Sequence, residues 1–216
     1  MTVIKICGIT RLEDALLCTD HGVELLGFNF YPGSPRCVAP ETCAEIINQL
    51  AKRNKKPVCV GVFVNLPAMQ IEQIMNKCGL DVAQLHGDET PTAVASLKIP
   101  NYKAFRGLPL PENSDEYPQP DQPNLPQILV DAAIKGQYGG TGAMLDWRTA
   151  AENFPINKRL LLAGGITPAN AKLAIELSSP WGIDLASGVE SAPGIKDPAM
   201  VAKLVAEARA ANSNNG

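Results

Sequence analysis

Residues 160–190, LLLAGGITPANAKLAIELSSPWGIDLASGVE, contain one complete repeat of the kind that builds a parallel sheet. Short apolar runs at Leu160–Ala163 and Gly182–Ala186 predict two buried strands. Between them, Pro168–Leu177 carries apolar residues at three- and four-residue spacing, and Thr167 stands where a helix cap is expected. A strand, a helix and a second strand in this order indicate parallel strands joined by a right-handed crossover.

The same alternation of strand and helix patterns recurs along the chain. The other expected strands are Val3–Cys7, Leu25–Phe30, Pro57–Val64, Val82–His86, Tyr102–Arg106 and Gln127–Asp131. The other expected helices are Arg11–Asp20, Pro40–Arg53, Pro67–Cys78, Thr90–Leu97, Asp146–Glu152 and Pro198–Ala210. Eight such units in 216 residues predict a compact α/β fold, a (β/α)8 TIM barrel somewhat shorter than the roughly 250 residues typical of that fold.

One repeat of the expected barrel is irregular. The segment Gly107–Pro126 contains six prolines together with Asp, Glu and Gln residues, so we expect an irregular, Pro-rich segment in place of a regular fifth helix. The sequence shows no linker that would split the chain. We therefore expect a single barrel domain at residues 1–210, followed by a frayed tail at Ala211–Gly216.

Composition and charge argue against several classes of partner. The formal net charge is −3, with no basic run and no acidic tail, so we expect neither nucleic acid nor an anionic membrane surface as a partner. No apolar run approaches the roughly 18 residues that span a bilayer, and the N-terminus lacks the pattern of a signal peptide. These features predict a cytoplasmic protein.

The cysteines and histidines argue against disulfides and metal sites. All six cysteines lie in the first half of the chain, with no C-x-x-C pair and no zinc-ligand spacing, and there are two histidines. We therefore expect free, mostly buried thiols and no metal ion.

Glycines concentrate after the last two expected strands, as Gly164–Gly165 and Ser187–Gly188. In many TIM barrels a phosphate binds between these two loops through backbone N–H groups. A Gly-Gly pair alone is usually a turn, but the two loops together favour a phosphorylated small-molecule ligand. The run Gly139–Gly142 (GGTG) is not a Walker A sequence, and a mobile covering loop explains it equally well.

Eight blocks of the sequence resemble one enzyme family. In chain order they are KICGIT, GFNFYPGSPR, VGVFVN, VAQLHGDE, ILVDA, GGTGAMLDW, LLAGGITPANA and GIDLASGVESAPGIKD. Their content and order, from Val3 to Asp197, resemble the phosphoribosylanthranilate isomerases of tryptophan biosynthesis. The resemblance implies a (β/α)8 barrel that converts N-(5-phosphoribosyl)anthranilate to 1-(2-carboxyphenylamino)-1-deoxyribulose 5-phosphate, an Amadori rearrangement that uses no cofactor.

The resemblance also implies a general base, Cys7, and a general acid, Asp131. The reaction needs an acid that protonates the ring oxygen and a base that removes the C2 proton. A thiol acts as a base where its surroundings favour the thiolate, and an apolar neighbourhood helps a carboxyl group to keep a proton for donation. Taken singly, Cys7 better fits an inert buried cysteine, and Asp131 also fits a turn or a helix cap. Their place at strand ends, within the family blocks, favours the catalytic interpretation.

Three further residues are candidates for the site. We assign Arg36 to the anthranilate carboxylate, because a guanidinium binds a carboxylate through two parallel hydrogen bonds; the alternative is a solvated surface arginine. Lys5 shares a strand face with Cys7. We therefore expect one of three roles for Lys5: it stabilises a Cys7 thiolate, it binds substrate, or it forms an ion pair with Asp184 or Glu24. Asp184 lies inside the expected eighth strand, where a buried carboxylate needs polar partners.

Several alternatives stay open. Ala186 stands where the family has a serine, and Met144-Leu145 replace a polar-aromatic pair, which leaves the packing of that loop open. His86 is expected to be a hydrogen-bonded residue at a strand end rather than a catalyst.

A histidine-pathway aminoaldose isomerase performs the same rearrangement with two aspartates, one at the place of Cys7, so KICGIT argues against it. A non-catalytic sensor of phosphorylated ligands would keep the glycine loops, and both a monomer and a homodimer fit the sequence.

Overall fold

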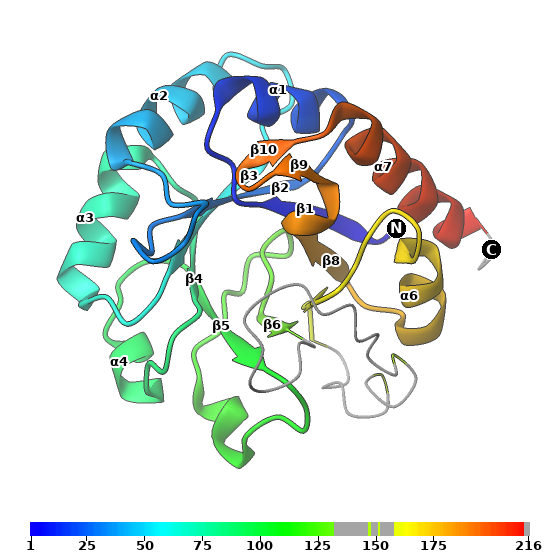
Figure 1. Ribbon diagram of the computed structural model, residues 1–216. Helices are drawn as coiled ribbons and strands as arrows, with labels where there is room; N and C mark the ends of the chain where they lie inside the picture. Colours follow the sequence, from blue (N-terminus) through cyan, green and yellow to red (C-terminus); the bar gives the residue numbers. More distant parts are fainter. Residues whose placement is uncertain (132–146, 148–150, 152–157, 214–216) are drawn as a thin grey trace.

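The computed structural model describes residues 1–131, 147, 151 and 158–213, and its eight parallel strands close into a barrel in the order β1-β2-β3-β4-β5-β6-β7-β8 (Figure 1). The strands are β1 Val3–Cys7, β2 Leu25–Asn29, β3 Val58–Phe63, β4 Val82–Leu85, β5 Asn101–Arg106, β6 Ile128–Asp131, β7 Leu160–Ala163 and β8 Gly182–Leu185. The helices are α1 Leu12–Asp20, α2 Pro40–Leu50, α3 Ala68–Cys78, α4 Pro91–Ala95, α6 Ala171–Ser178 and α7 Pro198–Ser213. Helices surround the barrel, so the predicted (β/α)8 fold is confirmed.

The predicted irregular segment is also confirmed. Between β5 and β6, the described elements comprise a single short 3-10 helix, η1 (Glu112–Glu116). The expected helix Asp146–Glu152 lies mostly outside the described residues, although Trp147 and Ala151 are both helical. The run Gly139–Gly142 lies outside the described residues as well.

Two predicted helix ends are wrong. Thr167 is not the cap of α6, because the Thr167 N–H donates to Asn170 Oδ1 (2.7 Å) and closes a turn, and the helix starts only at Ala171. At the other end of the chain, α7 continues to Ser213 instead of ending at Ala210. Ala211 is fully buried, as is Ala208 one turn earlier, so packing extends the helix.

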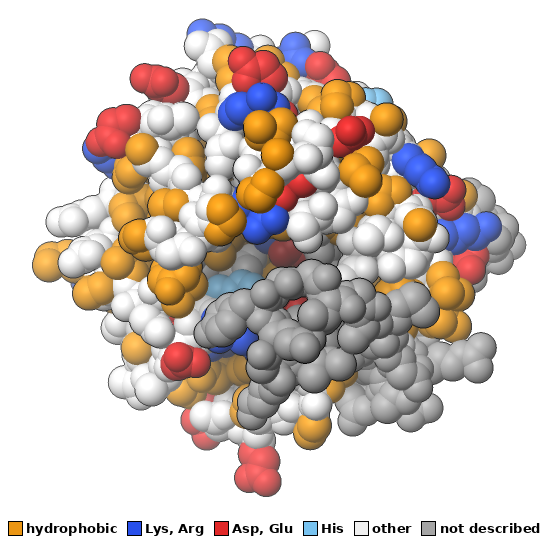
Figure 2. Space-filling model, viewed as in Figure 1, with side chains coloured by type: hydrophobic (Ala, Val, Ile, Leu, Met, Phe, Trp, Pro, Cys, Tyr) orange, Lys and Arg blue, Asp and Glu red, His pale blue; other side chains and the backbone are white. Residues whose placement is uncertain are grey.

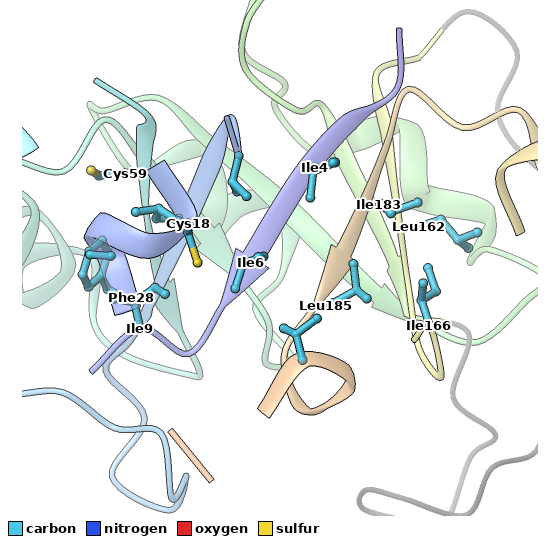
Figure 3. Packing of buried hydrophobic residues seen from close by; sticks show 14 of the residues in the cluster. Ile4, Ile6, Ile9, Cys18, Phe28, Cys59, Leu162, Ile166, Ile183 and Leu185 are labelled. Carbon is cyan, nitrogen blue, oxygen red and sulfur yellow. The ribbon is translucent and has the colours of Figure 1, made fainter. Parts of the chain in front are cut away.

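The strands alternate between two apolar environments. Ile4, Ile6, Ile183 and Leu185 point away from the barrel axis into the core shared with the helices (Figure 3). A second buried cluster lies inside the barrel and is made by the alternate positions of the strands, which include Leu25, Val60, Val82, Tyr102, Ala104, Leu129, Leu161 and Ala163. Because strand side chains alternate, this division tells which residues face the barrel interior.

A small antiparallel sheet, which the sequence did not predict, follows β8. It consists of β9 (Glu190–Ala192) and β10 (Ile195–Lys196), and it lies at the C-terminal end of β1 (Figure 1). Thr10 Oγ1 donates a hydrogen bond of 2.7 Å to the Gly194 carbonyl, which fixes the turn of this hairpin to the loop after β1.

The cysteines are all free thiols, as expected: Cys18, Cys43, Cys59 and Cys78 are buried, Cys7 is partly buried and Cys37 is exposed. Within the described parts of the chain, no helix combines the length and the apolar character that crossing a membrane requires.

Candidate active site

A hollow opens at the centre of the face that carries β9 and β10, and acidic side chains are visible inside it (Figure 2). Strand alternation turns four of the candidate residues toward the barrel interior. Lys5 and Cys7 alternate with outward-facing isoleucines on β1, while Asp131 and Asp184 occupy inward positions on β6 and β8. The structure therefore brings these four candidates together at one end of the barrel, the end where TIM-barrel enzymes carry their active sites.

The thiol of Cys7 fits against a glycine of the neighbouring strand. Cys7 and Gly27 are register partners on β1 and β2, and a Cβ atom placed on Gly27 would lie 2.7 Å from Cys7 Sγ. Only a residue without a side chain leaves room for the thiol there. Sequence reasoning did not single out Gly27, although a glycine inside the strand pattern LLGFN was the available signal.

Gly8 has a different neighbour. Its φ of +77° lies in the left-handed region, and a Cβ atom there would lie 2.6 Å from Cδ of Arg36. Gly8 therefore lets the aliphatic part of Arg36 cross directly over the end of β1. This contact explains the glycine that follows Cys7.

The Arg36 guanidinium is partly occupied by a carboxylate of the chain itself. Its Nε donates to Glu190 at 2.9 and 3.0 Å, and its Nη2 donates to Glu190 Oε2 at 2.7 Å. The Nη1 end of the fork takes no part in these bonds, so it keeps donors for a second carboxylate. Arg36 is thus an oriented residue rather than a solvated surface arginine.

Glu190 also binds a buried lysine that the sequence analysis did not identify. Lys196 Nζ donates to Glu190 Oε1 (2.7 Å) and to the Cys7 carbonyl (2.6 Å), and its side chain is fully buried. Burial alone would raise the pKa of Glu190, but the hydrogen bonds from Arg36 and Lys196 lower it, so this carboxylate is ionised. No periodic element was predicted over residues 190–196, so neither residue could be assigned to the face of a strand or helix.

Lys5 forms its ion pair with Asp184. The Nζ–Oδ2 distance is 2.7 Å, and both side chains are buried. Glu24, the other partner considered, instead accepts from the Ile4 N–H and from Arg209. Burial alone would lower the pKa of Lys5, but the Asp184 carboxylate outweighs this effect, so the pKa is raised and Lys5 stays charged.

The second carboxylate oxygen of Asp184 is an unused hydrogen-bond acceptor. Asp184 Oδ1 is buried and has no hydrogen-bond partner within the described residues. A buried acceptor without a partner is costly, and a ligand hydroxyl or N–H group would satisfy it.

The Cys7 thiol is held mainly in its protonated form. Burial raises the pKa of Cys7 above its usual value, and the nearby Lys5 and Lys196 ammonium groups offset only part of this effect.

Asp131 ends β6, and Cα register places it beside Ala163 of β7, which in turn pairs with Asp184 of β8. Asp184 pairs with Lys5 of β1. A continuous row of register partners therefore leads around the barrel from the candidate acid to the strand of the candidate base, and both side chains face the same interior.

His86 belongs to a hydrogen-bonded chain inside the barrel. Tyr102 Oη donates to Gln84 Oε1 (2.7 Å), and Gln84 Nε2 lies 2.8 Å from His86 Nδ1. Burial, followed by the charges of Lys5, Arg106 and Lys103, lowers the pKa of His86 to about 3. The ring is therefore neutral at physiological pH.

The two glycine loops touch each other. Gly164 and Gly165 have φ angles of +93° and +67°, which glycine adopts without strain. A Cβ atom on Gly188 would lie 2.2 Å from the Ile166 carbonyl oxygen, so the loops after β7 and β8 meet through bare backbone. Ser187, next to this contact, is exposed.

A separate cavity of about 340 Å³ lies at the opposite end of the barrel, beside the starts of β1, β2 and β3. Its lining includes Trp181, Lys55 and Lys56 but none of the candidate site residues.

Among the residues that the structure describes, no group of three or more His, Cys, Asp or Glu side chains is arranged to hold a metal ion.

A closed parallel barrel that gathers a thiol, carboxylates and an oriented arginine at the carboxyl ends of its strands defines a TIM-barrel enzyme. Comparison with known families makes this class specific. The family model described as N-(5'phosphoribosyl)anthranilate (PRA) isomerase matches residues 4–207, so the chain belongs to this isomerase family.

Individual relatives agree with the family match. The chain is 42% identical over 212 residues to N-(5'-phosphoribosyl)anthranilate isomerase of Syntrophus aciditrophicus, a match that covers 97% of this chain and 88% of the relative. It is similar to the crystal structure of phosphoribosyl anthranilate isomerase from Thermus thermophilus, with a TM-score of 0.82, 37% identity, and coverage of 97% of this chain and 99% of that one. A second similar structure is a phosphoribosyl anthranilate isomerase in complex with reduced 1-(o-carboxyphenylamino)-1-deoxyribulose 5-phosphate, with a TM-score of 0.76, 30% identity, and coverage of 97% of this chain and 100% of that one.

Proposed function

We propose that the protein converts N-(5-phosphoribosyl)anthranilate to 1-(2-carboxyphenylamino)-1-deoxyribulose 5-phosphate in tryptophan biosynthesis, with Cys7 as general base and Asp131 as general acid. The observation that supports it most is the convergence of both side chains on one barrel interior, at the C-terminal ends of β1 and β6. Family membership supports the substrate.

The chemistry begins with two proton transfers and ends with a tautomerisation, in which C1 gains a proton and the C2 hydroxyl group loses one. Asp131 donates a proton to the ribose ring oxygen while the C1–O bond breaks and the anilino nitrogen forms a C1=N iminium. The Cys7 thiolate then removes the C2 proton, and the electron pair moves toward the nitrogen to give an enolamine. Tautomerisation of the enolamine to the C2 ketone, with protonation at C1, gives the product.

The remaining site residues bind the substrate. The free end of the Arg36 fork binds the anthranilate carboxylate, oriented by Glu190. Backbone N–H groups of Gly164, Gly165, Ser187 and Gly188 bind the phosphate, in keeping with the close contact of their loops.

The deeper pair, Lys5 and Asp184, completes the polar floor of the barrel. The unpaired Oδ1 of Asp184 accepts a hydrogen bond from a substrate hydroxyl, while Lys5 neutralises the carboxylate through its other oxygen. Six free thiols, including the proposed base, suit a reducing compartment, and we place the reaction in the cytoplasm.

The direct test is turnover of freshly generated substrate, followed by loss of anthranilate-type fluorescence. Wild-type protein should consume the substrate, and Cys7→Ala and Asp131→Asn should each lower kcat by at least about 100-fold, the usual scale of a lost acid or base. Tight binding without turnover by the wild type would favour a sensor of phosphorylated ligands instead. Full activity of either variant would remove that residue from the acid-base pair.

A further inference from the structure

Lys196 has a fully buried side chain at the mouth of the barrel interior described above. Its Nζ contacts the Cys7 carbonyl (2.6 Å), Glu190 Oε1 (2.7 Å) and, more distantly, the Ala186 carbonyl (3.4 Å). One ammonium thus ties the end of β1 to the end of β8. A fully buried ammonium is tolerated only where such acceptors surround it.

The hairpin that carries Lys196 is itself fixed to the barrel. The Lys196 N–H donates to Asp14 Oδ2 (3.1 Å) on α1, and Asp14 also accepts two hydrogen bonds from Arg11. The Lys196 ammonium is therefore held in place before any ligand arrives, which is the condition for orienting other groups.

The charges of the cluster do not balance. Glu190 is a single carboxylate shared by two cations, Arg36 and Lys196, so the three side chains keep one excess positive charge. Glu190 is nearly buried and Lys196 fully so, which weakens screening by water. An excess positive charge beside Cys7 and Arg36 favours a thiolate and an incoming carboxylate.

We propose that Lys196 is a positioning residue for the isomerisation, which anchors the Cys7 end of β1 and, through Glu190, orients Arg36 toward the substrate carboxylate. This inference rests on the proposed function, since it assigns Lys196 a task within the same site. Lys196 and Glu190 thereby link the base of the reaction to Arg36, the group that binds the anthranilate carboxylate.

The first experiment follows the Cys7 thiol without any substrate. In a Cys37→Ser background, which removes the exposed thiol, the rate of Cys7 alkylation by iodoacetamide is measured against pH, with the labelled peptide identified by mass spectrometry. The charged and titratable groups near this thiol include Lys5, Asp184, Lys196, Arg36 and Tyr102, and Glu190 lies beside it as the partner of Lys196 and Arg36.

The two partners of the ion pair should move this titration in opposite directions. Lys196→Met removes a positive charge and should raise the thiol pKa by about one unit or more, whereas Glu190→Gln removes a negative charge and should lower it. A role limited to packing would lower the unfolding temperature of both variants without opposite shifts, and that result would overturn the inference. Lys196→Gln provides a second, polar replacement if Lys196→Met does not fold.

Kinetics with the substrate supply the second readout. Lys196→Met should lower kcat about tenfold and raise KM, because both Cys7 and Arg36 lose an orienting contact. Glu190→Gln should mainly raise KM. Lys56→Met is the matched control, since Lys56 is a lysine of an exposed ion pair at the opposite end of the barrel, and it should leave kcat, KM and the thiol pKa unchanged.

The two proposals can fail separately. A wild-type protein that turns over substrate, together with unchanged kcat and KM in Lys196→Met, would overturn the positioning role and leave the isomerase function standing. A wild-type protein without turnover would overturn the proposed function, while opposite thiol shifts would still support the coupling of Lys196 to Cys7.

Discussion

The thiol of Cys7 occupies the space that a side chain of Gly27 would need. A Cβ atom on Gly27 would lie 2.7 Å from Cys7 Sγ and 3.0 Å from Cys7 Cα. Because Cys7 and Gly27 are register partners on β1 and β2, neither strand can shift to relieve this contact without disturbing the barrel. The position of the proposed base is therefore set by a residue of the neighbouring strand.

Gly27→Ala should displace the Cys7 thiol and lower kcat at least tenfold, since about 1 Å of misplacement of a reacting group can cost about 100-fold in rate. Overpacking of this kind costs about 1–3 kcal/mol of stability. Gly61→Ala is the matched control, because a Cβ on that β3 glycine would clash with the ring of Phe63 in the outer core. Both variants should lose stability in thermal unfolding, but only Gly27→Ala should lose activity; equal kcat values would contradict the prediction.

The pH dependence of turnover should report the ionisation of Cys7 once the proposed acid no longer titrates. Burial raises the pKa of Cys7, so the thiolate fraction at neutral pH is small. In Asp131→Asn, whose amide does not titrate, the residual kcat/KM should therefore increase about tenfold per pH unit below the Cys7 pKa. Cys7→Asp should move this limb to acidic pH, because a carboxyl group has an ordinary pKa of about 4. A residual pH profile that is flat in Asp131→Asn, or unchanged when Cys7→Asp is combined with it, would argue against Cys7 as the base.

The raised pKa of Cys7 also makes the stability of the folded protein depend on pH. A thiol whose pKa is higher in the folded than in the unfolded state contributes stability below the unfolded pKa, and this contribution is lost as pH rises through the folded pKa. Wild-type protein should therefore lose more stability than Cys7→Ala between neutral and alkaline pH, measured by denaturant unfolding.

Asp184→Asn should destabilise the protein by about 3–5 kcal/mol, because it leaves the buried Lys5 ammonium without its counter-charge. Lys56→Met, which breaks a half-exposed pair with Asp81, should cost less than about 1 kcal/mol. Urea unfolding of both variants checks the difference. Equal losses would show that the Lys5–Asp184 pair contributes no more than a surface pair.

The site residues that could be predicted from the sequence lie on regular strands, whereas those that were missed lie on an irregular hairpin. Cys7, Asp131 and Asp184 lie within or at the end of regular strands, so alternation alone assigns them to the barrel interior. Glu190 and Lys196 belong to a short hairpin with a register shift, where no periodicity predicts a face. Their role follows only from contacts between residues that are far apart in the sequence.

Gly8 shows a related limit. A glycine that directly follows a strand is typical of a place where a ligand approaches the backbone, but the neighbour of Gly8 is the aliphatic part of Arg36, 28 positions later in the sequence. Likewise, Thr167 is of a residue type that often caps a helix, but α6 begins at Ala171 with Asn170 at the cap position. Local patterns predicted the elements of the barrel, whereas tertiary contacts decided which atoms meet at its mouth.

Arg36→Lys should raise KM by about 10- to 100-fold with a smaller effect on kcat, because an ammonium cannot bind Glu190 and the substrate carboxylate through parallel pairs of hydrogen bonds. Inhibition by free anthranilate should weaken by the same factor, since that ligand carries the carboxylate alone. Arg53→Lys, in an exposed pair with Asp20, is the control and should change neither constant. Unchanged inhibition by anthranilate in Arg36→Lys would assign the carboxylate to another residue.

Gly188→Ala should weaken binding of the phosphate. A Cβ atom at this position would lie 2.2 Å from the Ile166 carbonyl oxygen, and since that oxygen is backbone, the loops after β7 and β8 must separate. Hydrogen bonds from backbone N–H groups depend on their spacing, so we expect a KM increase of about tenfold or more and a matching loss of inhibition by ribose 5-phosphate. Ala186→Ser provides the contrast at a neighbouring position: it adds a hydroxyl but leaves the backbone in place, and it should leave KM within about twofold of the wild type. If Gly188→Ala folds normally and keeps its affinity for ribose 5-phosphate, the phosphate binds elsewhere and the two glycine loops serve only to close the barrel.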